Sequence, residues 1–191
     1  MTLQAASALL NTGAFEEAIA GFDDILADEP ANAAAYQGRA TAHFQLKQWA
    51  SAIADFTRAK ELNPGEGEHW VGLGMSLAME HRIYEAIDVF EAFLATHPDY
   101  VRGRMQLGLL YYQLAATGQG RRQMERALAA RPSLTERQLI ERVLREQRLL
   151  DRKRYYRPDF EALHTQSTAS PLRRWLTRLR GRFTPKCASA R

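Results

Sequence analysis

Cysteine is almost missing from this chain, since Cys187 is the only one among 191 residues. One thiol cannot close an intrachain disulfide, and no Cys/His cluster offers the ligands of a structural zinc site. Long apolar runs are missing too, because no stretch approaches the roughly 18 residues that a membrane-spanning helix needs. No basic residue precedes the first short apolar segment, as it would in a secretory leader. We therefore expect a cytoplasmic protein that is folded around an apolar core.

Catalytic and metal-binding motifs are also absent. The sequence contains no HExxH, no GxSxG and no phosphate-binding loop pattern. The histidines never fall three or four residues apart, and the acidic pairs Glu16–Glu17 and Asp23–Asp24 are adjacent on predicted helices, where neighbouring side chains diverge. We predict a non-enzymatic protein with no catalytic residue, no metal ligand and no cofactor.

Charge is divided unevenly along the chain. Residues 1–132 hold 11 Lys/Arg and 16 Asp/Glu, a net charge of −5, whereas residues 133–191 hold 15 and 6, a net charge of +9. The two parts can attract each other within one molecule or between molecules, or the basic part can bind an anionic surface.

Internal repetition is the strongest feature of the sequence. Prolines recur every 34 residues, and three further registers keep the same frame: Pro30, Pro64, Pro98 and Pro132; Phe22, Phe56, Phe90 and Met124; Ala18, Ala52, Ala86 and Gly120; Ala6, Ala40, Gly74 and Gly108. Small residues let crossing helices approach, and the rings fill the space beside them. The residue before each proline is biased away from helical dihedrals, so each proline marks a helix end. The period predicts stacked pairs of antiparallel helices.

These registers resemble the tetratricopeptide repeat family, whose units read W-x2-L-G-x2-Y, then A-x3-F, then P. The third unit carries most of the pattern, with Trp70, Leu73, Gly74, Leu77, Ala86, Phe90 and Pro98. The resemblance covers about two thirds of the chain and implies an all-α superhelical solenoid. We place units at 1–32, 33–66, 67–100 and 101–134, with helices near 2–12, 15–28, 34–46, 49–62, 68–80, 84–96, 102–114 and 120–130.

The fourth unit departs from the family pattern, with Gly118 and Gly120 at the predicted start of its second helix. Each helical glycine costs up to about 1 kcal/mol relative to alanine, so we expect this helix to be weak and Gly120→Ala to stabilise it. A capping box of Ser133 and Glu136 then introduces a long amphipathic helix at 135–156, which would cap the end of the solenoid. Its apolar residues recur at helical spacing: Leu139, Ile140, Val143, Leu144 and Leu150.

The C-terminal part comprises a predicted linker at 157–170 and a basic tail at 171–191. The tail has an apolar stripe at helical spacing, surrounded by arginines: Leu172, Trp175, Leu176, Leu179 and Phe183; Arg173, Arg174, Arg178, Arg180 and Arg182. Such a helix can lie on an anionic membrane at the inner face, or occupy a groove of its own chain or of another copy. A disordered, solubilising tail is the third alternative. Nucleic acid is a weaker candidate, because phosphate contacts leave the apolar stripe unexplained.

Function in a solenoid depends mainly on its concave surface, which the first helix of each unit lines. The third unit and the family alignment together predict a peptide-binding groove at Gln37, Thr41, Phe44, Gln45, Val71, Met75, Ala78, Met79, Arg102, Met105, Leu109 and Tyr112. Methionine suits an adaptable apolar groove. The alternative is that Met75 and Met105 are core residues or are covered by the tail.

The resemblance also raises the family's carboxylate clamp, which grips the acidic C-terminus of cytosolic chaperones. Those slots hold Gln37, Thr41, Gly72, Arg102 and Gln106 here, with a single cation. A buried carboxylate would lack the charged hydrogen bonds that offset its desolvation. We therefore predict an adaptor or assembly factor that binds an apolar or amphipathic protein segment; the alternative is an accessory structural subunit docked to an anionic membrane or membrane complex through its tail.

Overall fold

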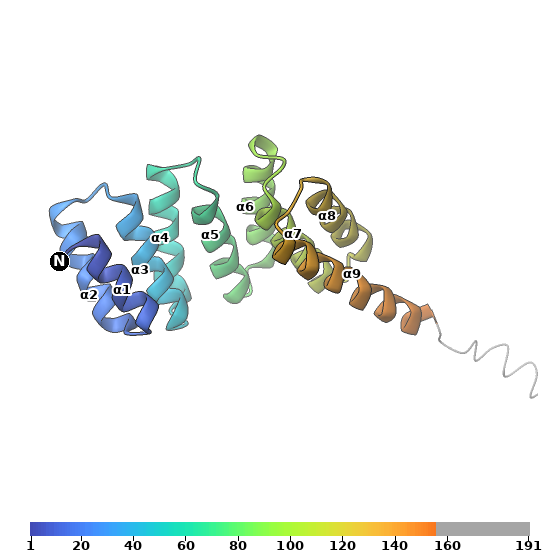
Figure 1. Cartoon of the computed structure of the whole chain (residues 1–191), viewed down its shortest axis with the longest axis horizontal. Coiled ribbons are helices and arrows are strands. Elements are labelled where there is room, and N and C mark those ends of the chain that lie inside the picture. The colour runs from blue at the N-terminus through green and yellow to red at the C-terminus, as the bar shows by residue number, and fades with distance from the viewer. Residues whose placement is uncertain (156–191) are drawn as a thin grey trace, which may run out of the picture. The chain divides into compact units, whose positions relative to one another are not determined.

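The computed structural model describes residues 1–155, which form nine α-helices and no strand (Figure 1). The helices are α1 (Leu3–Thr12), α2 (Phe15–Asp28), α3 (Ala33–Gln45), α4 (Trp49–Leu62), α5 (Gly67–Met79), α6 (Ile83–Thr96), α7 (Val101–Gln113), α8 (Thr117–Ala129) and α9 (Leu134–Tyr155). Residues 1–144 form the first compact unit of the chain. Within the first unit, each helix from α1 to α7 packs against the next one along the chain, as far as α8. The predicted all-α repeat fold is confirmed.

The repeat registers form the core of the first unit. Phe22, Phe56, Phe90 and Met124 are 0%, 5%, 1% and 0% exposed. The small residues lie against these large ones as the sequence predicts: a Cβ added at Gly74 would lie 2.5 Å from the Phe90 ring. Glycine is therefore required at that crossing, because any side chain would displace a buried ring.

Two start signals of the predicted helices are visible as hydrogen bonds. Asn32 Oδ1 accepts a hydrogen bond from Ala35 N at 3.0 Å and caps α3. Ser133 and Glu136 form the predicted capping box before α9, with Ser133 N donating to Glu136 Oε2 at 2.9 Å and Glu136 N donating to Ser133 Oγ at 3.3 Å. Both satisfy backbone groups that a helix N-terminus leaves without partners.

The first turns of α9 cover the last repeat. Ile140 and Leu144 are 0% and 8% exposed and join a cluster with Met105, Met124 and Ala127 from α7 and α8. Leu139, which the sequence pattern places on the same apolar face, is 37% exposed instead. The buried stripe of this segment is thus narrower than predicted.

The start of α8 corrects one predicted boundary. The helix begins at Thr117, not near residue 120, so both glycines lie in its first turn. A Cβ at Gly120 would lie 2.8 Å from the Tyr112 ring and 3.0 Å from the Gly108 carbonyl oxygen. The expected stabilisation by Gly120→Ala was therefore wrong, because this glycine allows α7 and α8 to cross closely.

Gly118 provides a matched comparison, since a Cβ there would meet nothing within 4 Å. We expect Gly118→Ala to stabilise the protein by up to about 1 kcal/mol through helix propensity. Gly120→Ala should destabilise it by about 1–3 kcal/mol through overpacking. Urea unfolding of the two variants measures both effects, and equal shifts would contradict the close crossing.

Candidate functional site

A cleft of about 270 Å³ lies among α3, α4, α5 and α7. It is lined by Gln37, Thr41, Phe44 and Gln45 of α3, Phe56 of α4, Glu68, Val71, Gly72 and Met75 of α5, and Arg102 of α7. On α3 and α5 these residues recur at intervals of three or four, so each helix turns one face to the cleft. First helices of three successive units therefore build one surface.

The apolar part of the cleft comes from Phe44, Phe56, Val71 and Met75. Phe56 belongs to the core register, yet its ring also reaches the cleft beside Gly72, where an added Cβ would lie 2.3 Å from it. Val71 is buried, whereas Phe44 and Met75 are half-buried and pack against the central core. A ligand in the cleft would thus contact side chains that are fixed by core packing, together with one flexible methionine.

The charges at the cleft compensate each other. Arg102 and Glu68 are the only charged residues among the ten that line it, and they form an ion pair. Tyr100 Oη also donates to Glu68 Oε1 at 2.7 Å. Burial, followed by this hydrogen bond, raises the pKa of Tyr100, so the phenol stays protonated and donating at neutral pH. A ligand carboxylate would have to compete with Glu68 for Arg102.

A buried histidine holds one polar lining residue in place. His69 is 2% exposed; its Nε2 lies 3.1 Å from Gln37 Oε1 and its Nδ1 lies 3.3 Å from the Asn63 carbonyl oxygen. Thr41 Oγ1 donates to the Gln37 carbonyl oxygen at 2.8 Å within α3. The two oxygens of Gln37 and the Thr41 hydroxyl are therefore engaged within the protein, so a ligand would mainly gain apolar contact there.

The predicted groove residues separate into two groups. Seven of the twelve line this one cleft: Gln37, Thr41, Phe44, Gln45, Val71, Met75 and Arg102. Three further lining residues, Phe56, Glu68 and Gly72, were not among the predicted groove residues. Gly72 is one of the clamp positions named above, and Glu68 lies three residues before Val71. Helical spacing could therefore have placed both residues on the face of α5 that lines the cleft.

The other five predicted residues do not line the cleft. Met105 is 6% exposed and packs in the cluster of α7, α8 and α9, so it is a core residue. Met79 and Leu109 are exposed at 49% and 39%, away from the cleft lining. Ala78 packs against the central core and Tyr112 against the same cluster as Met105. Met105 is thereby corrected to a core residue, and the other four positions lie outside the lining of this cleft.

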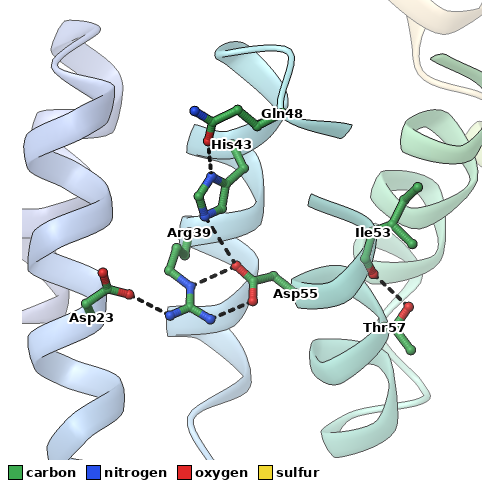
Figure 2. A network of polar contacts seen from close by, with 7 residues as sticks. All are labelled: Asp23, Arg39, His43, Gln48, Ile53, Asp55 and Thr57. Atoms are coloured by element: carbon green, nitrogen blue, oxygen red, sulfur yellow. Dashed lines mark hydrogen bonds and ion pairs between the residues drawn. The ribbon is translucent and has the colours of Figure 1, made fainter. Parts of the chain in front are cut away.

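A charged network inside the repeats was not predicted from the sequence (Figure 2). Arg39 of α3 donates from Nε and Nη2 to the two carboxylate oxygens of Asp55, at 2.8 and 2.6 Å, and from Nη1 to Asp23 at 2.5 Å. His43 Nε2 lies 3.9 Å from Asp55. Asp55 is 6% exposed, and its hydrogen bond raises the pKa of Arg39 further. Arg39 thereby ties α2 to α4 across α3.

This network replaces apolar packing found elsewhere in the array. In the 34-residue frame Arg39 corresponds to Leu73, which is 4% exposed, and Asp55 corresponds to Val89. We expect Arg39→Leu alone to cost about 2–4 kcal/mol of stability, because it leaves the Asp55 carboxylate buried without its main partner. The Arg39→Leu/Asp55→Val double variant should lie within about 1 kcal/mol of the parent. Chemical denaturation measures both, and additive losses would contradict the pairing.

Two other kinds of feature were sought in the described part of the chain, a metal site and a membrane-spanning helix. Between residues 1 and 155, no group of three His, Cys, Asp or Glu side chains could hold a metal ion, and no helix is long and apolar enough to cross a membrane. The predicted tail residues, from Leu172 to Phe183, lie outside the described residues.

Known proteins share this repeat architecture. Residues 3–67 match the model of the tetratricopeptide repeat family. Sperm-associated antigen 1 of Mus musculus is 32% identical over 88 residues, which is 46% of this chain and 10% of that protein. A thermophilic TPR protein of Thermus thermophilus aligns with a TM-score of 0.65 at 18% identity, over 78% of this chain and 82% of the other. The first TPR of Spaghetti (RPAP3) bound to an HSP90 peptide aligns with a TM-score of 0.55 at 24% identity, over 59% and 89%.

The helix pairs and their 34-residue registers define an all-α helical repeat fold, and residues 3–67 of it match the tetratricopeptide repeat model. It shares this fold with the solved TPR protein of Thermus thermophilus. It matches about a tenth of the length of the mouse relative, so the match concerns the repeats and not that whole protein.

Proposed function

We propose that this protein is a non-enzymatic adaptor that binds an apolar or amphipathic segment of a partner protein in the cleft among α3, α4, α5 and α7. One observation carries the proposal: apolar side chains and an internally paired Arg102–Glu68 couple line a concave surface built from three successive repeats. Solvent-exposed concave apolar surface is typical of binding sites.

Relatives support the general role. The RPAP3 domain that shares this fold is bound to a peptide of HSP90. The clamp slots nevertheless differ here, because Arg102 is the one cation among the lining residues and already pairs with Glu68. An acidic chain terminus would therefore gain little charge-assisted hydrogen bonding, and an apolar segment is the better occupant.

Selection from a displayed peptide library against the full chain tests the occupant. We expect the selected peptides to share large apolar side chains at helical or alternating spacing and to bind without a free C-terminal carboxylate. Selection of acidic peptides that require their terminal carboxylate would contradict the proposal.

A second candidate function rests on the tail sequence: docking to an anionic membrane or membrane complex. Five large apolar residues and five arginines occur within residues 172–183. A peptide of residues 171–183 is expected to become helical on vesicles that contain anionic lipid, with Trp175 emission shifted to the blue. Raising the salt concentration should weaken this binding. If the peptide does not bind the vesicles but binds a protein that lacks the tail, the tail instead occupies the groove of its own chain or of another copy.

A further inference from the structure

A second, polar cleft of about 240 Å³ lies among α6, α7 and α8 and shares no residue with the apolar cleft. It is lined by Glu91, Tyr111, Gln119, Arg122, Gln123 and Arg126. Arg122 and Arg126 are exposed and lie four residues apart on α8, so both guanidinium groups are on one face of that helix.

Positive charge is in excess at this cleft. Glu91 is the one carboxylate among its lining residues, and it accepts a hydrogen bond from Tyr111 Oη at 2.6 Å. This bond raises the pKa of Tyr111 to about 12, so the phenol remains neutral. Gln123 Oε1 accepts from a further cation, Arg104, at 3.0 Å. Neither Arg122 nor Arg126 forms an ion pair with any described residue.

The N-terminal end of the array has the opposite charge. Residues 1–38 contain no Lys or Arg and six Asp or Glu, all of them exposed on α2 and at its C-terminal end. Asp24 and Asp28 repeat the four-residue spacing of the two arginines, and the exposed Ala20 and Ala27 beside them leave room for a close approach. In its own molecule α2 packs against α1 and α3, and two repeats lie between α2 and α8 along the array.

We propose that copies of this chain associate head to tail, with α2 of one copy docked in the polar cleft of the next. Asp24 and Asp28 then pair with Arg122 and Arg126. Each copy carries both surfaces at different ends of its repeat array, so the contact is heterologous and one end stays open for another copy. Exposed ion pairs are individually weak and screened by salt. The assembly is therefore reversible, depends on concentration and dissolves as the ionic strength rises.

Sedimentation velocity of the full chain tests this contact through charge reversal. The parent should show a sedimentation coefficient that rises with concentration at low salt and falls to the monomer value at high salt. Arg122→Glu/Arg126→Glu and Asp24→Lys/Asp28→Lys should each weaken association by about tenfold or more, since attraction becomes repulsion. An equimolar mixture of the two variants should associate again, because the reversed surfaces of the two variants are complementary to each other.

Arg137→Glu/Arg142→Glu is the control, since it makes the same change in net charge as the arginine reversal at exposed positions of α9. It should leave association within about twofold of the parent, and circular dichroism should show unchanged helicity for all variants. A parent that stays monomeric at low salt overturns the proposal, as does a mixture that fails to associate. A third outcome would also overturn the proposal: association that is lost when the aspartates are reversed but kept when the arginines are reversed. In that case a basic segment other than α8 would bind α2.

Discussion

Replacing Ala86 with tryptophan is expected to collapse the central repeats. Ala86 is 0% exposed and lies on α6 in the core cluster with Leu77, Phe90 and Leu107. An indole cannot enter that crossing without separating α5 from α6, so the loss should exceed about 3 kcal/mol, the upper end for overpacked cores. Because neighbouring repeats stabilise one another, the whole array should melt at lower temperature.

Ala92→Trp is the matched control for this experiment. Ala92 lies on the same helix but is exposed, so the same substitution should change stability by no more than about 0.5 kcal/mol. Thermal melts followed by circular dichroism compare the two variants. A tolerated tryptophan at residue 86 would mean that the repeat register is wrong.

Most of the fold could be predicted because its determinants are local and recur. The prolines, the small residues and the aromatics repeat in one frame, and seven of the first eight helices begin within one residue of their predicted start. The exception is α8, which begins three residues before its predicted start. From the sequence its two glycines indicate a weak helix, because the residues that pack against Gly120 are not known from the sequence. Gly120 lies against Tyr112 and Gly108 of α7. Helix propensity describes a residue within its own helix and does not include such a contact between helices.

The Arg39 network escaped prediction for a related reason. Arginine stands in a frame position where Leu73 and Leu107 are buried, and sequence alone gives no partner for it. Asp23 and Asp55 lie 16 residues before and after Arg39, so only the stacking of α2, α3 and α4 brings them together. From the sequence, Asp23 is therefore only one of two adjacent acidic residues whose side chains diverge.

The connections inside the repeats add a second feature that sequence patterns did not indicate. Gly13, Lys47, His81 and Ala115 all adopt positive φ, from 58 to 83°, at intervals of 34 residues. Only the first of them is a glycine, the residue that favours this conformation. A search of the sequence for glycine would therefore predict only one of these four equivalent turns.

The candidate site was predicted in part, since the family frame identifies which face of α3 and α5 is concave. It failed at Met105 because α9 places Ile140 and Leu144 against that face of the last repeat. The cleft therefore spans the second and third repeats and includes only Arg102 from the fourth, and Met75 is the one methionine among its lining residues.

Binding of a selected apolar peptide to the Met75→Glu variant tests the central claim most directly. Met75 lines the cleft among Phe44, Phe56 and Val71, so a glutamate there would place an uncompensated charge in an apolar contact. We expect about 30-fold weaker binding or more, equivalent to about 2 kcal/mol, as for a central interface residue. Met79→Glu is the control, one turn further along α5, where the side chain is 49% exposed and outside the cleft.

Isothermal titration calorimetry of the parent and both variants supplies the measurement, with unfolding curves to show that each variant is folded. The account predicts that Met75→Glu loses the peptide while Met79→Glu binds it within about twofold of the parent. Equal affinities for all three proteins, or an equal loss in both variants, would contradict the cleft as the binding site.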